Sequence, residues 1–232
     1  MDVGKSFGYV FDDDQWITKI LIAAAILALG LLFSWMLLIP LLLAGLLLGG
    51  YGVEITRRVI NGASPVLPEW DDWAELLIDG VKAWVVGVIY ALPIIIVGVC
   101  LSPAIGIAAE DAEEVSSLFG SVLGCLNFLW GIVMGLLLPA AIAAWVAQDE
   151  LSAAFRFGDV ISLVRNNFGT YLIVLVIGWV ANIISGLGLL ACGVGFLVTA
   201  PYAGWITAHL RGQAYLVATG PGQQPAPEES PA

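Results

Sequence analysis

Charge is scarce in this 232-residue chain, since only 12% of its residues are charged. A soluble domain of this size carries about 25%, because its whole surface must face water. Basic residues are the rarer kind: 8 stand against 19 acidic residues, and the net charge is −11. Nucleic acid is therefore not an expected partner, because binding to phosphates needs basic patches. The acid excess also suggests a host with high internal salt, with chance loop acidity as the alternative.

Histidine and cysteine are equally scarce. His209 is the single histidine, so one chain cannot build a multi-histidine metal site. Cys100, Cys125 and Cys192 fall in or beside apolar segments without a close pair, which predicts small buried core residues. Neither a Walker A motif nor G-x-S-x-G occurs. We therefore expect no enzymatic activity, no cofactor and no metal.

Long apolar runs fill the chain instead, and hydrophobic residues make up 60% of it. A span needs about 20 apolar residues, and two runs are too long for one helix. Ser34, Trp35 and Pro40 break the first run, and glycines between residues 186 and 195 break the last. The sequence predicts an all-α, polytopic membrane helix bundle with about six spans in three hairpins, near residues 17–37, 39–57, 82–104, 118–147, 168–190 and 194–217.

These spans form one predicted domain over residues 1–218. Residues 219–232 are rich in proline, glycine and glutamine, a composition typical of a disordered tail. The segments near 34–39, 105–117 and 190–195 are predicted as loops on one side of the membrane. The loop at 105–117 carries four carboxylates, which we interpret as a solvated hairpin tip rather than a calcium site, because the EF-hand spacing is missing.

Two polar connectors are predicted as amphipathic helices at the membrane surface. In the first, over residues 65–82, Trp70 and Trp73 recur on one face with Trp84, while carboxylates occupy the other face. Tryptophans favour the headgroup level, so these three are interfacial anchors. The helix is acidic, so its attachment should depend on apolar burial rather than on anionic lipids.

Basic residues give the orientation. All eight lysines and arginines fall on the predicted side that also holds both termini and both connectors. The positive-inside rule then places this side in the cytoplasm. The sequence therefore predicts a multi-pass protein of the cytoplasmic membrane, with both termini in the cytoplasm.

Several motifs resemble one family. They are Asp14-Gln-Trp-Ile-Thr-Lys19, the hairpin end Gly50-Tyr-Gly-Val-Glu-Ile-Thr-Arg-Arg-Val-Ile-Asn-Gly62, Leu67-Pro-Glu-Trp-Asp-Asp-Trp73 and Asp79-Gly-Val-Lys82. Over about residues 8–90, and more loosely to 215, the chain resembles the DUF4013 family of uncharacterised bacterial and archaeal membrane proteins. The resemblance implies a membrane bundle with cytoplasmic connectors. It implies no activity and no catalytic residue.

A few polar residues are candidates for function. Glu54 shares a helix face with Arg57 and Arg58, which indicates either an ion pair that anchors a span or a proton-linked carboxylate. Asn127 and Asn182 lie within spans, where they either join helices or bind a polar substrate. A stripe of small residues predicts close helix packing, with a neighbour in the same chain or in a second copy; it consists of Gly120, Gly124, Gly131 and Gly135.

The leading hypothesis is a non-enzymatic membrane scaffold or interaction protein, whose partners are the lipid bilayer and a further protein or a second copy. The alternative is a small-molecule or ion transporter. A weak repeat between residues 73–84 and 157–168 and the two intramembrane asparagines favour that alternative. A water-filled path lined by Glu54, Asn127 and Asn182 would indicate transport, and a closed apolar interior would indicate a scaffold.

Overall fold

The computed structural model describes residues 1–35, 38–111, 113–190 and 194–220, and within residues 102–116 it describes the backbone alone. In these ranges the fold is all-α, with eight α-helices and no strand. The predicted fold class is therefore confirmed at this level. The predicted tail lies outside the described residues from 221 onward, as does Cys192.

The N-terminal helices form a bent arm. Helix α1 (Val3–Gly8) is capped by Asp2, whose carboxylate accepts the backbone N–H of Lys5. A 3-10 helix (Tyr9–Asp12) follows, and α2 (Trp16–Leu32) then leaves at 97° to this first segment. Helix α3 (Ile39–Ile60) begins after the predicted break.

Two very long helices follow as a hairpin, α4 (Trp73–Asp111) and α5 (Glu113–Gln148). At 1.5 Å per residue their 39 and 36 residues measure about 58 and 54 Å, against a hydrocarbon core of about 30 Å. The loop predicted near 105–117 is wrong, because α4 continues to Asp111 and α5 begins at Glu113. Ser102 and Pro103 do not end α4, since helix-compatible residues follow them.

The first connector also differs from its prediction. Residues 61–72 are a non-helical segment, and Trp73 starts α4, which runs without a break into the apolar stretch. The prediction of a separate surface helix over residues 65–82 is therefore wrong. The two prolines of this connector keep its first part extended.

The second connector does contain a separate helix. After a 3-10 helix (Leu151–Phe155), α6 (Phe157–Asn166) has one apolar and one polar face, and α7 (Phe168–Leu187) starts beyond Asn167. The two halves of the weak sequence repeat therefore differ, because residues 73–84 form one unbroken helix. A 3-10 turn (Gly188–Leu190) ends α7 at the predicted glycine break, and α8 (Val194–Thr219) returns.

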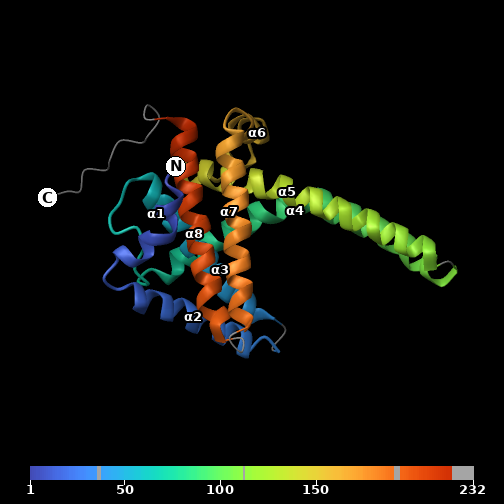
Figure 1. Cartoon of the computed structure of the whole chain (residues 1–232), viewed down its shortest axis with the longest axis horizontal. Helices are drawn as coiled ribbons and strands as arrows, with labels where there is room; N and C mark the ends of the chain where they lie inside the picture. Colours follow the sequence, from blue (N-terminus) through green and yellow to red (C-terminus); the bar gives the residue numbers. More distant parts are fainter. Residues whose placement is uncertain (36–37, 112, 191–193, 221–232) are drawn as a thin grey trace.

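Helix α8 lies at the centre of the molecule. It packs against α1, α2, α3, α5 and α7, which Figure 1 shows around it. The buried apolar side chains form two clusters. One joins five helices through Val53, Val86, Trp145, Tyr171 and Ile206. The other lies under the N-terminal arm and contains Tyr9, Ile20, Tyr51, Leu67 and Trp205.

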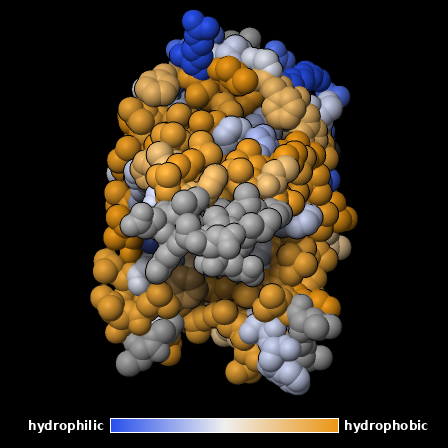
Figure 2. All heavy atoms as spheres, turned by 90° about the vertical axis from the view of Figure 1, so that its right-hand side faces the viewer, coloured by the Kyte–Doolittle hydropathy of each residue, from blue (hydrophilic) through white to orange (hydrophobic). Residues whose placement is uncertain are grey.

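The α4–α5 hairpin extends away from this body and runs across the direction of α7 and α8 (Figure 1). Figure 2 shows a largely apolar surface with hydrophilic residues gathered at its upper edge. Four described helical segments are long and apolar enough to cross a membrane, and five if the bent α1–α2 arm counts as one. Six spans were predicted, so this number is lower than expected. Helix α8, which corresponds to the sixth predicted span, is not among these segments. The four are Ile39–Ile60, Trp73–Leu101, Ser117–Gln148 and Phe168–Leu190.

Candidate functional site

The C-terminal end of α3 carries a cluster of paired charges. Arg57 binds Glu54 on its own helix and also Asp79 on α4, with 2.7 Å between Nη2 and Oδ2. Arg58 binds the same Glu54, with 3.1 Å between Nε and Oε1. Asp79 also accepts a hydrogen bond from Lys82 at 2.9 Å, and its carboxylate is nearly fully buried. The cluster thus fastens α3 to α4.

A second group of charges joins this cluster to α2. Lys19 is 2% exposed, and its Nζ lies 2.8 Å from Asp13 and 2.6 Å from Glu69. The same Nζ donates to the carbonyl of Leu67. Arg58 donates to that carbonyl from the other side, at 3.5 Å. The connector is therefore held over α2 and α3 by cations on both helices.

The whole network balances its charges. In the described part of the chain, four cations (Lys19, Arg57, Arg58 and Lys82) are paired with four carboxylates (Asp13, Glu54, Glu69 and Asp79). Glu54 is held by two guanidinium groups, those of Arg57 and Arg58. A cavity of about 350 Å³ lies beside the network, and Asp71, Asp72 and Glu75 add to its lining.

The three tryptophans have different environments. Trp70 stacks on Tyr51 with 4.2 Å between ring centroids, and its indole N–H donates to the carbonyl of Lys19. It therefore packs inside the protein, between the connector and α2 and α3. Trp73 and Trp84 lie on α4 and are 44% and 54% exposed. Only these two are placed on a surface that can face lipid.

The two asparagines do not meet. Asn127 on α5 donates to Leu123, and Asn182 on α7 donates to Gly178, each one turn back on its own helix. Both side chains are exposed. Within the described residues, neither lines a cavity with Glu54.

The glycine stripe on α5 has open space beside most of its length. No described atom of another element lies within 4 Å of a Cβ built on Gly120, Gly124 or Gly131, so the described residues show no close packing on these glycines. Gly135 does meet a neighbour, because its Cβ would lie 2.3 Å from Leu175 Cδ1 on α7. The cysteines beside this stripe are also not in the core. Cys100 and Cys125 are exposed, so the predicted burial is wrong for both.

Two other glycines make the closest helix contact. A Cβ on Gly50 would lie 1.7 Å from the carbonyl oxygen of Leu76, and one on Gly80 would lie 1.9 Å from that of Leu46. The crossing of α3 and α4 therefore requires glycine on both helices. Gly50 and Gly80 were not predicted as a contact, although small residues recur on both segments.

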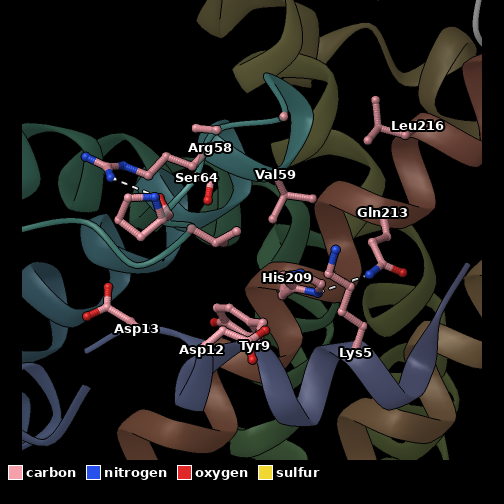
Figure 3. Close-up of a pocket in the computed structure, with 14 residues that line it drawn as sticks. Lys5, Tyr9, Asp12, Asp13, Arg58, Val59, Ser64, His209, Gln213 and Leu216 are labelled. Carbon is pink, nitrogen blue, oxygen red and sulfur yellow. Dashed lines mark hydrogen bonds between the residues drawn. The ribbon is translucent and has the colours of Figure 1, made fainter. Parts of the chain in front are cut away.

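A second cavity, of about 410 Å³, lies between α1, the end of α3 and α8. Figure 3 shows Lys5 and Tyr9 from the N-terminal arm facing His209 and Gln213 from α8, with Arg58 and Ser64 at the far end. Its polar lining comes from residues about 200 positions apart in the chain. Sequence spacing alone could not have found it.

Long apolar helices, with few charges in each of their apolar stretches, define a helical multi-pass membrane protein. The chain belongs to a family described as "Protein of unknown function (DUF4013)", whose model matches residues 33–194. The recognised family is thereby confirmed. No curated protein and no solved structure matches the chain. The motifs at 50–62, 67–73 and 79–82 lie within the matched range and build the charge network and the Gly50–Gly80 crossing.

Proposed function

We propose that this protein is a non-enzymatic membrane protein that acts through contacts within the bilayer, with the outer part of the α4–α5 hairpin as its contact surface. One observation carries the proposal. This part of the hairpin is apolar and exposed beyond the body of the molecule, as at Ile96 (57%), Leu118 (64%) and Val122 (47%). Lipid or another apolar helix fits such a surface.

The interior of the body supports contact rather than transport. Its buried side chains are mostly apolar, and the buried charges Lys19, Asp13 and Asp79 are held in ion pairs. Glu54 is neutralised by two arginines at one end, and the two asparagines lie on outer surfaces. The polar residues that a transport path would need are therefore far apart.

The proposal includes a location in the cytoplasmic membrane with both termini in the cytoplasm. Lys19, Arg57, Arg58 and Lys82 gather at the end of α3, and Lys5 lies in the adjoining cavity. An accumulation of basic residues on one side favours the cytoplasm.

Native mass spectrometry of the protein gently extracted from its own membrane tests the proposal. We expect a stoichiometric complex with a second copy or another membrane protein. Gly124→Leu should remove this complex, because it fills open space on the hairpin. Gly178→Leu on α7 is the matched control, since a Cβ there also meets no described atom within 4 Å. A chain that always runs alone, or a complex that both variants weaken equally, would contradict the proposal.

A further inference from the structure

The cavity in Figure 3 is lined by polar groups from the N-terminal arm and α8; among them Lys5 is exposed and His209 is buried. Its volume of about 410 Å³ lies within the range of small-ligand sites, about 300–1,000 Å³. Val59, Val66 and Leu216 form its apolar wall. His209 is 2% exposed, and its ring stacks on Tyr9 with 4.2 Å between centroids. The imidazole therefore has one fixed orientation in the cavity wall.

The hydrogen bonds around His209 determine which ring nitrogen carries the proton. The backbone N–H of Asp2 donates to Gln213 Oε1 at 2.9 Å, so the amide nitrogen of Gln213 is the atom that faces His209. That nitrogen lies 3.3 Å from Nδ1, and an amide nitrogen can only donate. Nδ1 is thus the acceptor, and Ser6 Oγ lies 2.9 Å from it as well. The proton of the neutral ring is on Nε2, which has no acceptor among the described residues.

Lys5 provides a positive charge in the same cavity. No described carboxylate lies within 4.0 Å of its ammonium, in contrast to the fully paired cations of the charge network. Figure 3 shows its side chain beside His209 and Gln213. The cavity thus presents one charged and one neutral donor to a common space.

The carboxylates of the lining limit the charge of a ligand. Asp13 is bound to Lys19, whereas Asp12 is exposed and has no ion pair in the described chain. Arg58, at the far end, is held by Glu54 and by the carbonyl of Pro65. Lys5 attracts an anion bound beside it, whereas Asp12 repels negative charge, so a ligand with a single negative charge is favoured over a dianion.

We infer that this cavity binds a singly charged phosphodiester. One non-bridging oxygen accepts from the Lys5 ammonium, and the other accepts from His209 Nε2–H. Charge-assisted hydrogen bonds to phosphate oxygens are among the strong ones. The cavity lies at the end of the apolar helix α3, where lipid headgroups are found. The source is either a phospholipid headgroup or a water-soluble phosphodiester, and this assignment does not depend on the proposed contact function.

Titration of the full chain in a maltoside micelle with phosphatidylglycerol, read by native mass spectrometry, tests the inference. We expect one tightly bound lipid per chain. Lys5→Gln should weaken it about tenfold, because one charged hydrogen bond is lost. Arg165→Gln is the matched control, since Arg165 is exposed on α6 and has no ion pair within the described residues. It should bind as the unmodified chain does.

Two further ligands distinguish a phospholipid headgroup from a water-soluble phosphodiester. Glycerophosphoglycerol carries the phosphodiester without acyl chains, and its competition with the lipid would indicate a soluble ligand. Binding of the intact lipid alone would indicate a headgroup site. Diacylglycerol carries the acyl chains without phosphate, and its equal binding would overturn the inference. Equal affinities of the Lys5→Gln variant and the unmodified chain, or equal losses in both variants, would overturn it too.

Discussion

Single residues decide how closely α3 and α4 approach. Gly50 and Gly80 each face a backbone carbonyl of the other helix at a distance that no Cβ can occupy. In a membrane, where lipid is as apolar as leucine, such close backbone packing is a main source of helix association. The stripe at Gly120, Gly124 and Gly131 has the same sequence appearance but no described neighbour.

Gly80→Ala should therefore destabilise the protein, because the added methyl group meets the Leu46 backbone and the helices must separate. We expect a loss of about 1–3 kcal/mol in the free energy of unfolding, measured by thermal or denaturant unfolding in micelles. Gly124→Ala is the control and should leave stability unchanged or raise it by up to about 1 kcal/mol, because alanine favours a helix more than glycine does. Equal effects of the two substitutions would show that the crossing is not as close as described.

Two arginines have opposite environments. Arg57 binds Glu54 and Asp79, whereas the buried Nε of Arg211 has no hydrogen-bond partner in the described chain. Arg57→Met should lower stability by about 1–3 kcal/mol, because Asp79 keeps its buried charge with Lys82 as its remaining partner. Arg211→Met should leave stability unchanged or raise it, since it removes an unsatisfied polar group. The midpoints of thermal unfolding compare them, and a larger loss for Arg211→Met would reverse this interpretation.

At the scale of elements, the α4–α5 hairpin is unlike the rest of the molecule. Helices α1, α2, α3 and α7 pack against α8, whereas in the described residues the outer parts of α4 and α5 extend beyond the body and lie beside each other. An apolar groove of about 250 Å³ lies along it, lined by Pro93, Ile94, Leu126 and Trp130 among others. A hairpin of this kind is stable only where water is excluded.

The cysteines of the hairpin test its surroundings. Cys100 and Cys125 are exposed there, so in a Cys192→Ser background they report on what covers them. In nanodiscs we expect a charged maleimide to modify neither residue, because hydrocarbon excludes the reagent and disfavours the reactive thiolate, and to modify both after the protein is unfolded in detergent. Peptide mass spectrometry counts the modified sites. Rapid labelling by the charged reagent would place the hairpin in water.

For the whole molecule, the positions of the charged residues determine which parts must lie in water. Glu110, Asp111, Glu113 and Glu114 flank the hairpin turn, and such a group of carboxylates is too costly to leave in hydrocarbon. The hairpin tip must therefore reach water. Because α4 and α5 are much longer than the bilayer is thick, a strongly tilted hairpin can still do so.

We expect a cysteine at Glu113 to react with an impermeant reagent added outside intact cells. A cysteine at Asp159, exposed on α6, should react only after the membrane is opened. Both variants are made in a chain without its native cysteines, and gel shift with a maleimide polymer measures the labelling. Protection of position 113 from the outside would contradict the predicted orientation.

The sequence by itself determined the class of this protein and most of its helix breaks. Apolar runs, glycines and prolines act over a few residues, so the helix ends at Leu32 and Leu187 could be located approximately from local composition. The same local signals predicted a loop at 105–117, which is wrong because Ser102 and Pro103 do not by themselves end a long helix. They also placed the start of a helix near residue 65, whereas α4 begins at Trp73. Glu54, Arg57 and Arg58 were found for the same reason, since they share one helix turn.

Only the tertiary structure decided which distant residues meet. Lys19 binds Glu69, 50 positions further along the chain, and Ser6 contacts His209, 203 positions away. Gly50 lies against the backbone carbonyl of Leu76 on α4. No periodicity encodes such pairs, because they arise when whole helices pack and the chain between them can follow many paths. The phosphodiester cavity and the neutral charge network are products of that packing, whereas the membrane character is a property of composition alone.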